Sequence, residues 1–215
     1  MKIEIWSDVM CPFCYIGKRN FETALNQFKN KDQIEVIWKS FQLDPSAPDV
    51  AEETQHEYLV KRKGMTDAQV KGMLDNVTQM AQNAGLEYHL DKSVMVNSFK
   101  AHRLIQLAKN KGLSDEAEER MFSAFFTEGL NIADTDILLQ IGKEIGLDEE
   151  DIKTAMEDNK YVEMIQKDIA EAQTLGVQGV PFFVFNRKYG VSGAQPPNQF
   201  LQTLEKSFSE WKENN

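Results

Sequence analysis

The stretch SDVMCPFCYIGKR, residues 7–19, is the most informative part of the sequence, because it contains both cysteines of the chain. Residues 2–6 before it alternate between apolar and polar side chains, a pattern typical of a β-strand. From Pro12 onward the apolar residues recur at helical spacing, and a proline is well tolerated at the first position of a helix. The pattern therefore predicts a strand followed by a helix, with Cys11 at the N-cap and Cys14 one turn further on the same face.

This placement favours redox chemistry. The first turn of a helix has unpaired N–H groups and a partial positive charge, and both favour a thiolate at Cys11. A thiolate attacks a disulfide sulfur and forms a mixed disulfide. Cys14 is then placed to attack that mixed disulfide and release the substrate. The sequence therefore predicts that Cys11 is the attacking cysteine and Cys14 the resolving one.

Two simpler explanations of the cysteine pair are less well supported. A structural zinc site needs four ligands, but the chain has no second cysteine pair, and His56, His89 and His102 are scattered. Two buried and inert cysteines do not require the strand, Cys-x-x-Cys, helix arrangement. We therefore expect a redox-active dithiol and no metal.

Composition sets limits on the class of protein. The chain has 215 residues, of which 41% are hydrophobic and 27% charged, as in ordinary soluble domains. Its net charge of −10 disfavours nucleic acid and anionic membranes as partners, and no apolar run is long enough to span a membrane. The N-terminus resembles no secretory signal, so we expect a cytoplasmic protein, in which a lone cysteine pair is more often catalytic than structural.

The rest of the chain divides into a helical block and a second strand-containing segment. Residues 33–41 alternate like a strand, so the chain opens as β-α-β. Residues 45–176 show about seven capped helical segments and no strand pattern. Residues 180–185 and 189–193 then predict a hairpin, and a last helix follows Pro196. We expect an α/β fold in which residues 1–44 and 177–215 form one discontinuous domain, and 45–176 an inserted helical domain.

Five segments in the same order carry a resemblance to a known family. They are residues 7–17, 97–104, 126–129, 176–184 and 192–197. Together they resemble the DsbA family, in which a thioredoxin fold (β-α-β, then β-β-α) carries a large helical insertion. Within that family the chain is most similar to the cytosolic FrnE-like dithiol–disulfide oxidoreductases.

The resemblance implies a substrate surface around the dithiol. Pro181 looks like the cis-proline that faces the dithiol in thioredoxin-like proteins. Val180 would offer its backbone groups to an extended substrate segment, as in strand addition, with Pro12 and Phe13 on the same surface. Without the resemblance, a trans proline at the start of an edge strand would be favoured, because cis bonds before proline are uncommon.

The sequence also departs from its relatives. Thioredoxin has a buried acid six residues before its first cysteine, where this chain has Ile5, so another group or water must serve Cys14. The histidine between the cysteines of periplasmic DsbA is absent, which predicts a weaker oxidant. Asp8, His102 and Arg103 are candidate supporting residues. Each also has a structural explanation, respectively a turn residue, a buried structural histidine and a surface ion pair, and for the last two we favour it.

These features predict a thiol–disulfide oxidoreductase or isomerase that acts on protein or small-molecule disulfides. It needs no bound cofactor beyond its own redox-active disulfide, with glutathione or the thioredoxin system as candidate reductant. One alternative is a glutathione-dependent isomerase or transferase of the kappa class or the hydroxychromene-carboxylate isomerase type, which typically has serine at the first motif position. Another is a redox-sensing binding module. The sequence predicts no oligomeric state.

Overall fold

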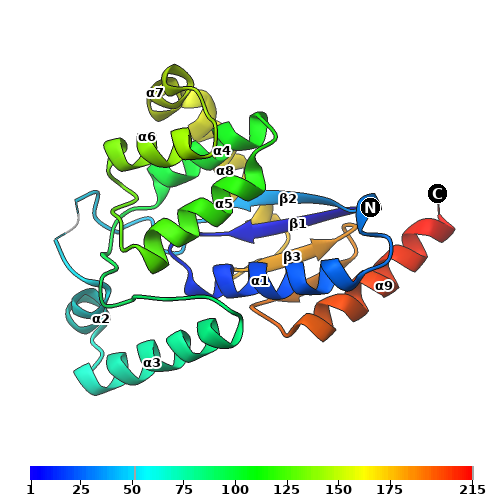
Figure 1. Ribbon diagram of the computed structural model, residues 1–215, viewed down its shortest axis with the longest axis horizontal. Coiled ribbons are helices and arrows are strands. Elements are labelled where there is room, and N and C mark those ends of the chain that lie inside the picture. Colours follow the sequence, from blue (N-terminus) through cyan, green and yellow to red (C-terminus); the bar gives the residue numbers. More distant parts are fainter. Residues whose placement is uncertain (51, 215) are drawn as a thin grey trace. The chain divides into compact units, whose positions relative to one another are not determined.

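The computed structural model describes residues 1–50 and 52–214, and it divides into two compact units (Figure 1). Unit 1 consists of Met1–Leu43 together with the segment from Lys167 to the C-terminus. Unit 2 consists of Asp44–Gln166. Both cysteines and the segment around Pro181 belong to unit 1, so this unit contains the candidate dithiol site.

Unit 1 is built on a mixed sheet, which has four strands in the described part of the chain, in the order β2-β1-β3-β4. The strands are β1 (Lys2–Ser7), β2 (Glu35–Ser40), β3 (Phe182–Phe185) and β4 (Tyr189–Ser192). β1 pairs in parallel with β2 and antiparallel with β3, which in turn pairs antiparallel with β4. This is the thioredoxin-like arrangement that the resemblance implied, and its central strand β1 leads directly into the cysteine motif.

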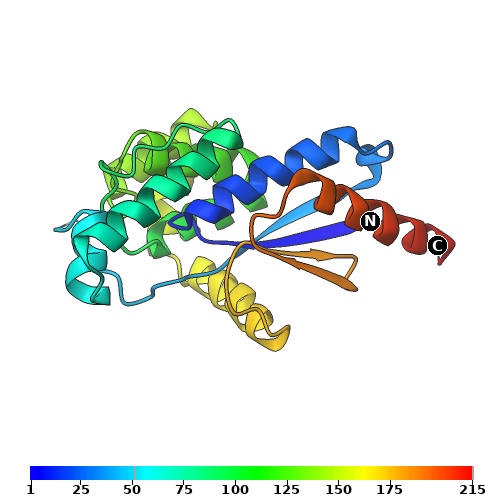
Figure 2. The same ribbon diagram turned by 90° about the horizontal axis from the view of Figure 1, so that it is seen from below.

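Helices cover both faces of this sheet (Figure 2). On one face lie α1 (Pro12–Gln27) and α9 (Pro197–Glu213), and the core between helices and sheet includes Ile5, Phe21 and Phe200. On the other face, Trp6 and Val184 pack with Ala172 near the end of α8 (Asn159–Thr174). The period-two alternation of β1 follows from this, because neighbouring residues face opposite layers.

The boundary between the units differs from the one expected. The sequence predicts that the thioredoxin-like domain resumes at residue 177, whereas the structure assigns the chain from Lys167 onward to unit 1. The reason is that the last turns of α8 are bonded to the sheet. The Trp6 indole Nε1 donates to the carbonyl of Asp168 at 2.8 Å, and the Ser40 amide donates to the Asp168 carboxylate at 3.0 Å.

Unit 2 is helical. The seven helices that the structure describes between residues 45 and 176 agree with the number expected. They are α2 (Gln55–Lys63), α3 (Asp67–Asn83), α4 (Phe99–Asn110), α5 (Ser114–Phe122), α6 (Thr135–Glu144), α7 (Glu149–Glu157) and α8, whose first turns lie in this unit. α4 packs against α5, α6 and α7, and a single π-helical turn, Ser123–Thr127, extends α5. Among the described residues, none of the helices is both long and apolar enough to cross a membrane.

Candidate active site

The cysteine motif has the local geometry that the sequence predicts. Cys11 is the N-cap of α1 with extended backbone angles, φ −85° and ψ 111°, and Pro12 is the first helical residue. The Cys11 amide donates to the carbonyl of Asp8, and the Cys14 amide donates to the carbonyl of Cys11, each at 2.9 Å. The two thiols are not joined to each other. These turns place both sulfurs at the start of α1.

The loop before β3 meets Cys11. The Val180–Pro181 peptide bond is cis, and the Cys11 thiol donates a hydrogen bond to the carbonyl of Val180 at 3.3 Å. Because β1 and β3 are antiparallel neighbours, the end of β1 and the start of β3 lie at the same edge of the sheet. The cis bond and its place beside Cys11, both implied by the resemblance, are therefore confirmed as geometry.

Gly17 allows α1 to approach this loop closely. A Cβ atom added to Gly17 would lie 2.9 Å from Cγ of Pro181 and 3.4 Å from the Phe183 ring. The first distance is shorter than side chains tolerate without a shift of the neighbouring atoms. The contact between the dithiol helix and the proline loop therefore depends on the absence of a side chain at Gly17.

Cys14 is buried, and its environment favours the neutral thiol. Burial, together with the neighbouring Cys11 sulfur, raises the pKa of Cys14, while the Asp8 backbone and the Ser7 hydroxyl act in the opposite direction. Ile5, which takes the place of thioredoxin's buried acid, lies in the apolar core between the sheet and α1. The groups that favour a thiolate at Cys14 are thus backbone and hydroxyl groups.

Asp8 holds the turn before the cysteines. Its side chain is buried, with one carboxylate oxygen accepting from the Met10 amide at 3.3 Å and the other from the Leu43 amide at 2.8 Å. The expected turn role is therefore present. In addition, Asp8 ties the turn to the segment that follows β2.

His102 and Arg103 lie on α4 of unit 2, and the structure gives Arg103 a structural task. Its guanidinium donates to the carbonyls of Ala155 and Met156, at 3.2 and 2.5 Å, and so satisfies the C-terminal end of α7. This replaces the surface ion pair that we expected. His102 is fully buried among the helices of its unit. The contacts of Arg103 are those of a helix cap.

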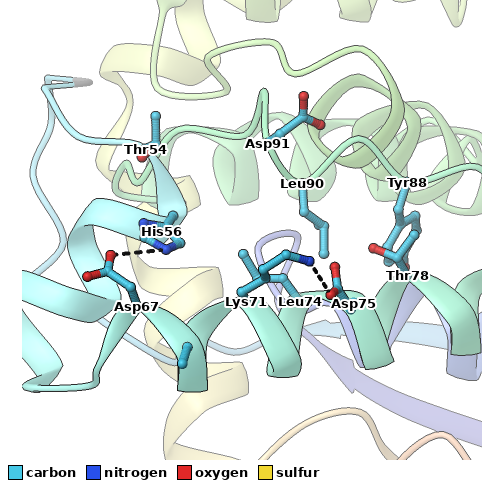
Figure 3. Close-up of a pocket in the computed structure, with 11 residues that line it drawn as sticks. Thr54, His56, Asp67, Lys71, Leu74, Asp75, Thr78, Tyr88, Leu90 and Asp91 are labelled. Atoms are coloured by element: carbon cyan, nitrogen blue, oxygen red, sulfur yellow. Dashed lines mark hydrogen bonds and ion pairs between the residues drawn. The ribbon is translucent and has the colours of Figure 1, made fainter.

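A separate pocket lies within unit 2, between α3 and the segment around residues 86–91 (Figure 3). It has a volume of about 620 Å³, with Leu74, Tyr88 and Leu90 among its lining residues. At one end, the His56 ring lies 3.5 Å from the Asp67 carboxylate. None of the predicted site residues lines this pocket. The residues that the structure describes also contain no cluster of three or more side chains able to hold a metal ion.

Ser7 and Gly17 are site residues that the sequence reasoning did not single out. A signal for Gly17 exists, because an isolated glycine inside a helical pattern often marks a close approach. For Ser7, the alternation of β1 indicates only the face of the sheet, and its place near the cysteines depends on how α1 packs on that face. The sheet, the dithiol at a helix N-terminus and the facing cis-proline together define a thioredoxin-like dithiol protein.

Comparison with known proteins agrees with this class. The family model described as "DSBA-like thioredoxin domain" matches residues 2–205, and the chain belongs to this family of DsbA-like thiol–disulfide oxidoreductases. The chain is 30% identical over 187 residues to the uncharacterized protein YwbO of Bacillus subtilis, with 85% of each protein covered.

Two solved structures are also similar. A probable DsbA oxidoreductase from Streptomyces coelicolor is 36% identical, with a TM-score of 0.92, covering 98% of this chain and 91% of that one. The cytosolic disulfide reductase DsbM from Pseudomonas aeruginosa, solved with GSH, is 18% identical, with a TM-score of 0.70, covering 97% of this chain and 100% of that one. The second similarity concerns the fold alone.

Proposed function

We propose that the protein is a thiol–disulfide oxidoreductase in which Cys11 attacks and Cys14 resolves. The Cys11 thiolate attacks one sulfur of a disulfide R–S–S–R′, so that a Cys11–S–S–R bond forms and R′ leaves as a thiolate, which takes up a proton. Cys14 then attacks Cys11, the Cys11–Cys14 disulfide forms, and R leaves as the second thiol. The substrate gains two electrons and the dithiol loses two, and the reverse sequence oxidises a substrate dithiol.

The hydrogen bond from Cys11 to Val180 carries this proposal. It brings the proposed nucleophile to a loop whose backbone can also hold a substrate. Among the described residues, none accepts a hydrogen bond from the Val180 amide, so this donor is available to an extended substrate segment. Phe13 is 38% exposed beside Cys11, and the exposed ring together with Pro12 offers an apolar surface to the same segment.

The influences on Cys14 suit an ordered reaction. In the reduced protein, burial is the largest influence that raises the pKa of the Cys14 thiol, and the Cys11 sulfur adds to it. Once Cys11 is joined to substrate in a disulfide, its sulfur has neither a thiol hydrogen nor a charge, so both of its contributions to the raised pKa of Cys14 are removed. Cys14 therefore becomes easier to ionise at the step in which it must attack.

The proposed setting is the cytoplasm, as part of the FrnE-like branch, with glutathione or the thioredoxin system as reductant. The similar DsbM is described as cytosolic and was solved with GSH, which supports this setting. The net charge of −10 supports substrates other than nucleic acid. Protein and small-molecule disulfides both fit the open Val180 amide.

Trapping of intermediates tests the proposal. Tagged Cys14→Ser protein, reduced and mixed with a model disulfide or with cell extract, should hold covalent partners on a non-reducing gel, because the resolving thiol is missing. The matched Cys11→Ser variant should hold none, because no attacking thiolate is present. Mass spectrometry of the trapped peptide should find the partner on Cys11.

Other outcomes would point to the alternative functions. A glutathione-dependent transferase or isomerase would retain turnover of an electrophilic substrate after the Cys14→Ser change. A redox-sensing module would show no catalytic turnover of a model disulfide even when unsubstituted. Equal trapping by the two variants would contradict the assigned roles of Cys11 and Cys14.

A further inference from the structure

We infer that the Ser7 hydroxyl is a catalytic hydrogen-bond donor that stabilises the thiolate of Cys14 during resolution. This rests on the function proposed above and adds a residue to the resolving step. During resolution Cys14 must carry a negative charge although it is buried. Residue 5 is an isoleucine, so no carboxylate at that position can accept the proton of Cys14. Ser7 supplies a neutral donor at that place.

The strand pattern directs Ser7 toward α1. Residues of the same parity in a strand point to the same face, and Ile3 and Ile5 of β1 both lie in the core beneath α1 and α9. Ser7 therefore points to the face that carries α1 and α9, two residues further along β1 than Ile5 and closer to the cysteine motif. Gly17 of α1 lies against Phe183, which pairs with Ile5 in the sheet, and α1 begins at Pro12, shortly after Ser7. The first turn of α1, which contains Cys14, therefore lies toward the Ser7 end of β1.

The backbone of Ser7 is fixed while its hydroxyl is unpaired. Ser7 lies opposite Ser40 in the parallel ladder, and its carbonyl accepts from the Phe41 amide at 3.0 Å. The residue is 1% exposed, and its Oγ has no hydrogen-bond partner within the described protein. A buried hydroxyl without a partner is costly and calls for an explanation. A donor reserved for a charge that forms only during the reaction provides one.

The groups around Cys14 agree with this role. After burial, hydrogen bonding and electrostatic interaction with the neighbouring Cys11 sulfur raise the pKa of Cys14, whereas the Asp8 backbone and the Ser7 hydroxyl lower it. The Asp8 carboxylate is engaged with the Met10 and Leu43 amides. Before resolution the proton of Cys14 passes to the thiolate R′ released in the first step, and Ser7 donates to the charged Cys14 sulfur without losing its own proton. R then leaves as a thiolate and takes up a proton from solvent.

A titration that does not depend on activity tests the inference. In Cys11→Ser protein Cys14 is the only thiol, and thiolate absorbance near 240 nm reports its ionisation. Adding Ser7→Ala should raise the midpoint by about one pH unit, because a hydrogen bond to a charged group is lost. Ser7→Thr keeps the hydroxyl and should restore the midpoint. Ser40→Ala removes a buried hydroxyl from the residue of β2 that pairs with Ser7, and it should leave the midpoint of the Cys14 titration unchanged.

The resolving step gives a second test. Reduced protein mixed with an aromatic disulfide reagent should release two coloured thiols in succession, the first by Cys11 attack and the second by Cys14. Ser7→Ala should slow the second phase about tenfold near neutral pH and leave the first unchanged, with the difference vanishing at high pH.

The outcomes separate the two proposals. The role of Ser7 would be overturned if Ser7→Ala left both the midpoint of the Cys14 titration and the rate of the second phase unchanged. It would also be overturned if Ser7→Ala slowed both phases equally, because that result indicates a structural effect. A missing second phase in the unsubstituted protein would overturn the proposed function instead. A midpoint shift rescued by Ser7→Thr supports the donor even in that case.

Discussion

At the residue scale, the site depends on what Gly17 lacks as much as on what the cysteines supply. The atom nearest to a side chain added there would be Cγ of Pro181, in the loop whose carbonyl accepts from Cys11. Glycine costs stability inside a helix, so its presence one turn after Cys14 is compensated by the close contact. A side chain at residue 17 would therefore require Pro181 or α1 to shift.

Gly17→Ala should consequently destabilise the protein, by about 1–3 kcal/mol for overpacking, reduced by the gain in helix propensity. The rate at which Cys11 reacts with a model disulfide should fall with it. Gly72→Ala is the matched control, because Gly72 lies in α3 with no atom within 4 Å of an added Cβ. This control should stabilise by up to about 1 kcal/mol. Urea unfolding measures both, and equal effects would contradict the close-contact explanation.

At the element scale, a charge cluster joins the sheet to the end of α8. The Lys39 ammonium on β2 lies 2.8 Å from the Glu171 carboxylate, 3.3 Å from Asp168 and 3.7 Å from Glu4. Arg187, between β3 and β4, pairs with Glu4 and with Glu171. Burial alone would lower the pKa of Lys39, but its carboxylate partners outweigh this and raise it. For Glu171 burial acts upward, while Lys39 and Arg187 bring the pKa below its usual range.

Lys39→Met should therefore lower the free energy of unfolding by about 3 kcal/mol near neutral pH, because it removes a cation that pairs with the buried carboxylate of Asp168 and with Glu171. The raised pKa of Lys39 means that its contribution is present below the ordinary lysine range and is lost at strongly alkaline pH. The lowered pKa of Glu171 means that its contribution is present above the ordinary glutamate range and is lost in acid. The difference in the free energy of unfolding between Lys39→Met and the unsubstituted protein should thus shrink below about pH 4.

Lys2→Met provides the control for this prediction. Lys2 also sits on the sheet, but its pair with Glu35 is 3.5 Å long with both side chains more than half exposed, and such pairs contribute little. Denaturant unfolding across pH compares the variants. Equal losses for Lys39→Met and Lys2→Met would show that the cluster adds no stability.

Most elements could be predicted because their signals are local. Cys11 before Pro12 marked a helix start, and alternation marked β1 and β2. The end of the helical insertion could not be placed, because α8 continues through the boundary without a break and only its contacts with Trp6 and Ser40 assign its last turns to unit 1. The capping of α7 by Arg103 could not be predicted either, because Arg103 and Ala155 are 52 residues apart in the sequence and no local pattern connects them.

At the scale of the whole molecule, the three tryptophans, Trp6, Trp38 and Trp211, all belong to unit 1. Their fluorescence reports on the sheet unit, whereas circular dichroism also reports on the helices of unit 2. The candidate dithiol, being in unit 1, was predictable from one motif. Its partner loop, 169 residues away from Cys11, required the resemblance, and the position of Ser7 required the structure.

Arg103→Met should therefore lower the free energy of unfolding of unit 2 by about 1 kcal/mol, because the helix cap is lost. The urea midpoint seen by circular dichroism should fall accordingly, and the transition seen by tryptophan fluorescence should stay in place. The physical reason is that each unit is compact by itself. Lys39→Met should do the reverse and move the tryptophan transition first. Coincident shifts of both signals in both variants would show that the units unfold as one cooperative structure.

The central strand has a further consequence during synthesis. β1 leaves the ribosome long before its antiparallel neighbour β3, which begins at Phe182. At about 5–20 residues per second, that neighbour follows roughly 10–40 s later. Until then one edge of β1 is unpaired and its apolar side chains lack their final cover, which exposes the nascent chain to aggregation. Stalled or truncated translation products should aggregate far more readily than the finished protein.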